Sequence, residues 1–141
     1  MKAGIIRPLA VCIIKHQGNL LVTMSRDSVK NSTFGRLLGG GIEFGETGIQ
    51  ALKRELKEEL GTDLENIKYL KTLENIFTYE GAQGHEIVFL YEADLVNKDL
   101  YQKDNIKILD NNEGGEATWQ KISDFKSKKL ILYPEFPHEY L

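Results

Sequence analysis

Residues 47–61 have both of their ends marked as the ends of a helix. Thr47 can act as the N-cap, and Gln50 three residues later completes a capping box. Gly61 stands where a glycine commonly ends a helix. At about 100° per residue, one apolar stripe is formed by Ile49, Leu52, Leu56 and Leu60. The stretch therefore predicts an amphipathic helix that packs one face against a core.

The charged side chains of this helix are sorted by sign. Glu55, Glu58 and Glu59 fall on one side of the stripe, and Lys53 and Lys57 fall on the other. Each like-charged pair three or four residues apart costs about 0.2–0.5 kcal/mol on an exposed helix. A cation can offset this repulsion, and carboxylates are hard oxygen ligands suited to Mg²⁺ or Mn²⁺. Lysines or arginines from elsewhere in the fold can balance the charge equally well, so the pattern alone leaves both explanations open.

Three glycines, Gly39 to Gly41, precede Glu46 and the start of the helix. Glycine permits a positive φ and a close approach of the backbone. A glycine-rich turn before a helix can hold an anion on its N–H groups or direct a carbonyl toward a cation. A tight loop is the simpler alternative. The stretch is not a P-loop, because the Gly-Lys-Ser/Thr ending is missing.

Apolar, β-branched runs alternate with polar turns along the rest of the chain. The predicted strands are residues 9–16, 20–26, 67–79, 85–95 and 117–122. The first two are expected to form a hairpin around residues 17–19, and the next two flank a turn at 80–84. Polar loops are expected at 27–36 and 97–115, and a last helix from about Ser123. Strands combined with two helices predict an α+β fold with a mixed sheet between helices.

Composition limits the classes of protein that remain. With 141 residues, of which 41% are hydrophobic and 28% charged, the chain is expected to form one domain over residues 1–141. A net charge of −3 does not indicate a polybasic surface for nucleic acid or membrane. No run reaches the ~18 apolar residues of a membrane span, and a cytoplasmic location is expected. Cys12 lies in an apolar run and is expected to be buried.

Residues 40–62 resemble the Nudix box, Gly-x5-Glu-x7-Arg-Glu-U-x-Glu-Glu-x-Gly-U, in which U is a bulky aliphatic residue. The fixed positions are filled by Gly40, Glu46, Arg54, Glu55, Glu58, Glu59 and Gly61. Thr62 at the final U position is the one departure. The order of the predicted strands also looks like that of the family, which implies an α/β/α sandwich.

The resemblance implies a hydrolase that depends on Mg²⁺, with Mn²⁺ as a substitute. Its substrate would be a nucleoside diphosphate linked to another moiety, and water would attack one phosphorus of the pyrophosphate. The implied metal ligands are Glu55, Glu58, Glu59 and the carbonyl of Gly40. Glu55 can alternatively orient the attacking water. Glu46 and Arg54 would form a structural ion pair between loop and helix, and Arg54 can also orient a catalytic carboxylate.

A general base is expected from a later loop, as is common in the family. Glu113 or Glu116, just before the strand that carries Trp119, is the candidate, and a solvated loop position is the alternative for both. His85 and Glu86 could also face the site, but a place on the sheet surface is expected for them.

The substrate remains open among a dinucleoside polyphosphate, a nucleotide sugar and a modified nucleoside triphosphate. Tyr79 stands about where relatives that hydrolyse diadenosine polyphosphates carry a tyrosine that can stack on a base. Phe34, Phe77 and Trp119 are further aromatic candidates, although packing is the expected role of all four. The expected partner is a small-molecule nucleotide, without nucleic acid or membrane, and a homodimer is left open.

A second class of function shares this fold. The chain could be a non-catalytic nucleotide-binding regulatory module. Such a module would have no need of three carboxylates that repel one another, so the intact Glu55, Glu58 and Glu59 favour the enzyme.

Overall fold

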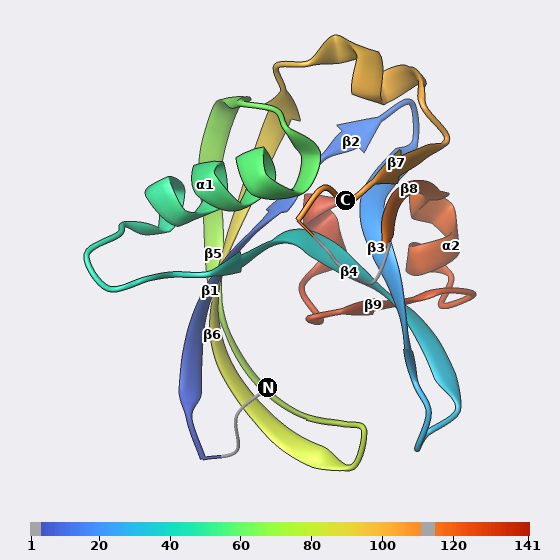
Figure 1. Ribbon diagram of the computed structural model, residues 1–141. Coiled ribbons are helices and arrows are strands. Elements are labelled where there is room, and N and C mark those ends of the chain that lie inside the picture. Colours follow the sequence, from blue (N-terminus) through green and yellow to red (C-terminus); the bar gives the residue numbers. More distant parts are fainter. Residues whose placement is uncertain (1–3, 111–114) are drawn as a thin grey trace.

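The computed structural model describes residues 4–110 and 115–141. Strands and helices follow one another along these residues as expected for an α+β chain (Figure 1). The strands are β1 (Ile6–Ile13), β2 (Lys15–His16), β3 (Asn19–Asp27), β4 (Ser32–Gly41), β5 (Leu64–Tyr79), β6 (Ala82–Leu95), β7 (Asn105–Lys107), β8 (Glu116–Lys121) and β9 (Ile131–Tyr133). The helices are α1 (Gly48–Leu60) and α2 (Ile122–Lys126), with short 3₁₀ helices η1 (Lys98–Gln102) and η2 (His138–Tyr140).

The strands form one mixed sheet with two arms that share β4. Its order is β5-β6-β1-β4-β3-β8-β7, with β2 added to β3 and β9 added to β4. β4 pairs with β3 through residues 32–37 and with β1 through residues 38–41. The pairs β1–β6 and β4–β9 are parallel, whereas the other pairs are antiparallel. Figure 1 shows the two arms spreading apart below β4.

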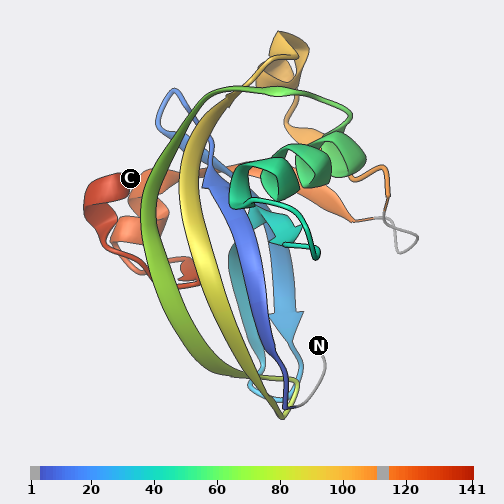
Figure 2. The same ribbon diagram turned by 90° about the vertical axis from the view of Figure 1, so that its left-hand side faces the viewer.

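Each face of the sheet carries its own core. α1 packs on one face, where its buried residues Ala51, Leu52, Leu56 and Leu60 join Ala10 and Cys12 of β1. α2 packs on the other, where Phe125 joins Leu9, Val11 and Ile13. Alternate residues of β1 therefore serve opposite cores, as the side-chain period of a strand requires. Figure 2 shows β5, β6 and β1 between the two helices, which confirms the predicted sandwich and the burial of Cys12.

Helix α1 begins and ends at the predicted residues. The hydroxyl of Thr47 accepts from the backbone N–H of Gln50 at 3.2 Å, and the side chain of Gln50 accepts from the N–H of Thr47 at 2.9 Å. Gly61 adopts the left-handed conformation with φ of 67° and donates to the carbonyl of Lys57. The capping box and the terminal glycine are both confirmed.

The predicted hairpin of residues 9–16 and 20–26 is wrong over most of its length. Only Lys15 and His16 pair with β3. β1 pairs instead with β4 and, in parallel, with β6. Both runs are apolar because both are covered on two faces, and such a run carries no information about its neighbour in the sheet.

The predicted polar loops at 27–36 and 97–115 are also too long. β4 already starts at Ser32, which leaves residues 28–31 as the connection, and η1 and β7 occupy part of the later loop. The glycines Gly39 to Gly41 belong to the end of β4 rather than to a loop. Polar side chains in these stretches, such as Thr33, Asn105 and Lys107, lie on the solvent side of paired strands, so polarity alone does not mark a loop. None of the helices in the described part of the chain is long and apolar enough to cross a membrane.

Candidate active site

The glycines at the end of β4 allow α1 to lie close to the sheet. Gly39 has φ of 140°, and a Cβ on it would collide with the carbonyl oxygen of Ala10. A Cβ on Gly40 would overlap the carboxylate of Glu55, which lies directly against the strand. The absence of a side chain at Gly40 therefore allows the Glu55 carboxylate to lie against the strand.

Arg54 ties the loop before α1 to the helix. Its Nε donates to Glu46 Oε2 at 2.7 Å and its Nη2 donates to Glu46 Oε1 at 2.9 Å, in a two-pronged pair. Nη2 also donates to the carbonyl of Gly41 at 3.0 Å, and Nη1 donates to Glu55 Oε1 at 3.0 Å. Hydrogen bonds from Arg54, and then from the backbone of Glu43, lower the pKa of Glu46 to about 2. The structure thus brings together Glu46, Arg54 and Glu55.

Three carboxylates gather on the outer side of α1. One oxygen from each of Glu55, Glu58 and Asp110 lies within 4.8 Å of the others, so the group could hold a metal ion. Asp110 reaches the helix because the N–H of Leu109 donates to the carbonyl of Glu59 at 2.9 Å. Sequence reasoning missed Asp110. It directly precedes the stretch that carries Glu113 and Glu116, and the acidic character of that stretch is the sequence signal that could have indicated it.

Glu59 points inward beside this group. Its Oε1 is buried and has no hydrogen-bond partner among the described residues. Burial, followed by the charges of Glu55 and Asp110, raises the pKa of Glu59 to about 8. Burial is also the main cause that raises the pKa of Glu55. A divalent cation bound by oxygen ligands would satisfy the orphaned oxygen and offset the repulsion, so these residues fit such an ion.

Of the two residues expected to supply a general base, the structure describes only Glu116, which is not part of the carboxylate group. Glu113 lies outside the described residues. Glu116 is exposed at the start of β8, where it pairs with Lys107 of β7. Among the residues that the structure describes, the later loop instead contributes Asp110 to the carboxylate group.

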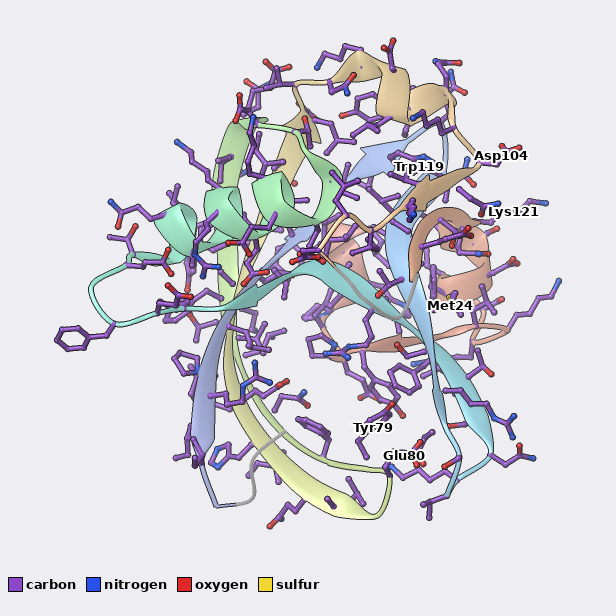
Figure 3. The ribbon with its side chains drawn as sticks, viewed as in Figure 1. Met24, Tyr79, Glu80, Asp104, Trp119 and Lys121 are labelled. Atoms are coloured by element: carbon purple, nitrogen blue, oxygen red, sulfur yellow. The ribbon has the colours of Figure 1, made fainter. Side chains whose placement is uncertain are left out.

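A cleft of about 660 Å³ lies between the two arms of the sheet, lined by β1, β4, β5, β6 and residues 133–135. Four aromatic residues line it: Phe34, Phe77, Tyr79 and Tyr133. Tyr79 meets Phe34 edge to face at 6.0 Å, and its hydroxyl donates to the carbonyl of Arg26 at 3.3 Å. Figure 3 shows Tyr79 at the end of the gap farther from α1.

The remaining aromatic candidate is a packing residue. Trp119 stacks on Tyr101 at 5.6 Å and donates from Nε1 to the carbonyl of Leu100 at 3.3 Å. Figure 3 shows Trp119 on β8, at the opposite end of the molecule from Tyr79. The packing role expected for Trp119 is confirmed.

Glu86 was expected on the sheet surface, and this expectation is wrong. The residue is 7% exposed and lines the cleft. It sits on β6 between two neighbouring strands, a burial that the sequence of one strand alone does not reveal. His85, the preceding residue, is only partly buried.

The far end of the cleft is closed by contacts between two turns. The carboxylate of Asp27 accepts from the backbone N–H groups of Val29 and Lys30 at 3.0 Å and from that of Glu80 at 3.2 Å. Glu80 in turn accepts from the backbone N–H of Ser28 at 2.7 Å. Figure 3 shows Glu80 at the β5–β6 turn, on the side that faces the β3–β4 hairpin. These contacts join the tips of the two arms.

One residue that lines the cleft, Arg7, lies near Gly41 at the end of β4. Nη2 of Arg7, which lines the cleft, lies 3.6 Å from the position of a Cβ on Gly41. The carbonyl of Gly41 accepts from Arg54, as described above. Gly41 at the end of β4 therefore lies between Arg7, which lines the cleft, and Arg54 of the carboxylate helix.

The fold and the site together define an α/β/α sandwich with an acidic, cation-compatible helix beside a cleft of ligand size. The model of the family described as the NUDIX domain matches residues 6–137, and the chain belongs to this family.

Two curated relatives are enzymes by name. The chain is 29% identical over 115 residues to the NAD-capped RNA hydrolase NudC of Klebsiella pneumoniae (strain 342), covering 74% of this chain and 42% of the relative. It is 38% identical over 71 residues to the RNA pyrophosphohydrolase of Bartonella clarridgeiae, covering 48% of this chain and 40% of the relative. The chain thus spans about two fifths of the length of these relatives.

Among solved structures, a mutator MutT protein from Bacillus halodurans has a similar fold. The TM-score is 0.58 at 19% identity, over 86% of this chain and 72% of that chain. At this identity the likeness shows the fold alone.

Proposed function

We propose that the protein is a divalent-cation-dependent hydrolase that cleaves a pyrophosphate bond in a nucleoside diphosphate linked to another moiety. The observation that carries this proposal is the gathering of Glu55, Glu58 and Asp110 within 4.8 Å, beside a buried and unpartnered oxygen of Glu59. The names of the two curated relatives support the reaction class. A purely regulatory module would gain nothing from this costly arrangement of like charges.

The proposed ligands of the cation, Mg²⁺ or Mn²⁺, are Glu55, Glu58, Glu59, Asp110 and the carbonyl of Gly40. When bound, such a cation neutralises charge on phosphate oxygens and makes water a better nucleophile. Arg54 orients the Glu55 carboxylate through its 3.0 Å hydrogen bond. Asp110 joins Glu113 and Glu116 as a candidate for the general base, because it is held beside the helix.

The nucleoside part of the substrate is proposed to lie in the cleft. Its volume of about 660 Å³ is within the range of about 300–1,000 Å³ typical of small-molecule sites. The phosphates would then extend past Arg7 toward the carboxylates. Dinucleoside polyphosphates, nucleotide sugars and modified nucleoside triphosphates all have this layout. Because both curated relatives are named for RNA substrates, a capped or triphosphorylated RNA 5′ end joins these candidates.

A substrate panel tests this proposal. We expect hydrolysis of at least one member with Mg²⁺ or Mn²⁺, none in excess chelator, and recovery when the cation is restored. Products identified by mass show which bond breaks. The Glu58→Gln variant serves as the inactive control for contaminating phosphatases. Full turnover in excess chelator would refute the cation dependence, and no turnover of any member with either cation would refute the reaction class.

Arg54 and Glu46 are expected to act as one structural unit. Arg54→Ala should lower both the melting temperature and the rate, because it releases the loop and frees the Glu55 carboxylate. Arg54→Lys should recover only part of each, since an ammonium cannot form the two-pronged pair. Glu46→Gln should lower the melting temperature similarly while cation affinity is largely kept. In a double-variant cycle the combined loss should be little more than either single loss, and simple addition would mean that the two residues are not partners.

A further inference from the structure

Three polar side chains form a row across the cleft-facing side of β1, β6 and β5. The strand register places Arg7 opposite Glu86, and Glu86 opposite Asn75. All three residues line the cleft. The row beside them, one pleat further along the strands, is apolar and consists of Leu9, Val88 and Leu73. A polar row therefore lies next to an apolar row on this wall of the cleft.

The carboxylate of Glu86 is buried in this wall but only weakly bonded. Nη1 of Arg7 lies 3.8 Å from its Oε2, and Nδ2 of Asn75 lies 3.5 Å from its Oε1. Both distances exceed the range of about 2.7–3.2 Å of an ordinary N–H···O bond. Within the described residues, no shorter side-chain hydrogen bond to this carboxylate occurs. A buried carboxylate needs its hydrogen bonds satisfied, so Glu86 has acceptor capacity to offer a ligand in the cleft.

Aromatic side chains stand near this row. Phe77 lies on the same strand as Asn75, two residues on, and therefore faces the same side. Phe34, from β4 in the other arm, meets Tyr133 edge to face at 5.2 Å. A flat ring that enters the cleft can pack on an aromatic face while its edge meets the polar row. These neighbours favour a nucleoside over a purely aliphatic ligand.

We propose that Glu86 determines the specificity of the cleft by accepting two adjacent hydrogen-bond donors of a nucleoside on its two carboxylate oxygens. Two parts of a nucleoside carry such a pair: the N1–H and 2-amino group of guanine, and the 2′,3′-diol of ribose. Arg7 beside Glu86 supplies donors to an acceptor on the same ligand, such as the guanine O6 or a phosphate oxygen. The inference rests on the proposed function only in taking the ligand to be a nucleotide, and it does not require turnover.

The test uses metal-free full-length protein and four nucleosides: guanosine, 2′-deoxyguanosine, inosine and adenosine. Backbone amide shifts by nuclear magnetic resonance give both affinity and location. If Glu86 accepts hydrogen bonds from the edge of the guanine base, inosine and adenosine should bind about ten- to a hundredfold more weakly than guanosine, and 2′-deoxyguanosine should bind as well as guanosine. If Glu86 accepts hydrogen bonds from the ribose diol, only 2′-deoxyguanosine should bind weakly. In either case Glu86→Gln should weaken the binding of the preferred nucleoside by about the same factor and remove the difference in affinity among the four nucleosides.

Glu92→Gln is the matched control, because Glu92 lies on the same strand but does not line the cleft. It should bind like the unmodified protein. A folded Glu86→Gln variant that keeps the affinity and the discrimination overturns the inference, as does the absence of shifts at the cleft at saturating nucleoside. Should Glu86→Gln fail to fold, Arg7→Gln replaces it, since the Arg7 side chain is 41% exposed. Arg7→Gln should weaken the preferred nucleoside about tenfold, and an unchanged affinity would overturn the inference.

The role of Glu86 and the proposed hydrolase function can fail independently of each other. Binding that depends on Glu86 without hydrolysis of any panel member would overturn the hydrolase alone. Hydrolysis whose substrate preference is the same with glutamate or glutamine at position 86 would overturn the role of Glu86 alone.

Discussion

Glu58→Gln is expected to lower turnover at least about a hundredfold while leaving the metal-free fold as stable as before, or more so. The loss in rate follows because a catalytic cation supplies several kcal/mol of transition-state stabilisation and the glutamine would hold that cation less well, and about 1.4 kcal/mol corresponds to a factor of ten. The stability result follows from the surroundings of Glu58. Its side chain is 46% exposed, and its only close cationic neighbour among the described residues, Arg54 Nη1, lies 3.5 Å away. The carboxylates of Glu55 and Asp110, each with an oxygen within 4.8 Å of an oxygen of Glu58, repel it.

Two measurements separate these effects. Initial rates with saturating Mg²⁺ give the catalytic loss, and melting curves in chelator give the stability of the metal-free chain. Glu65→Gln is the matched control, because Glu65 is a glutamate on β5 paired with Lys98, away from the carboxylate group. A clear drop in the melting temperature of Glu58→Gln would mean that Glu58 is a structural partner, and the proposed cation site would lose its main support.

Local signals in the sequence predicted the elements whose cause is local. Thr47, Gln50 and Gly61 fix the ends of α1 through hydrogen bonds to backbone groups at most four residues away. The sorting of charge on the helix likewise follows from the 3.6-residue period and needs no knowledge of the fold. The pairing of Arg54 with Glu46 could be predicted because the spacing of the two residues matches the Nudix box.

Features that depend on residues far apart in the sequence could not be predicted from local signals. The parallel partner of β1 is β6, with Ile6 opposite His85, and the apolar composition of β1 is compatible with many partners. Asp110 is brought to α1 by a backbone hydrogen bond from Leu109 to the end of the helix. The burial of Glu86 depends on the register of three strands. In each case the deciding contact joins segments whose relation is set by the assembled sheet.

In the absence of a divalent cation, the protein should lose stability as the pH rises from about 5 to about 8. Burial first, and then the charges of Glu55 and Asp110, raise the pKa of Glu59 to about 8, from an ordinary value of 4.5. Between these values the folded chain keeps a proton that the unfolded chain has released. Because the folded state binds more protons, its free energy of unfolding falls as the pH rises, by an amount on the order of a few kcal/mol. The charge of Glu55, whose own pKa is raised mainly by burial, acts on Glu59, so the transition belongs to this pair.

Denaturant unfolding in chelator at pH 5, 6.5 and 8 measures this slope. Glu59→Gln should flatten it and should be more stable than the unmodified chain at pH 8, since the buried charge is gone. Glu139→Gln, a change at an exposed glutamate of η2, should leave the slope unchanged. Mg²⁺ or Mn²⁺ should reverse the slope of the unmodified protein, because the cation binds the deprotonated carboxylates and its affinity therefore increases with pH. A metal-free stability that is flat from pH 5 to 8 would mean that Glu59 is ionised without a cation. The orphaned oxygen would then have a partner other than a metal ion.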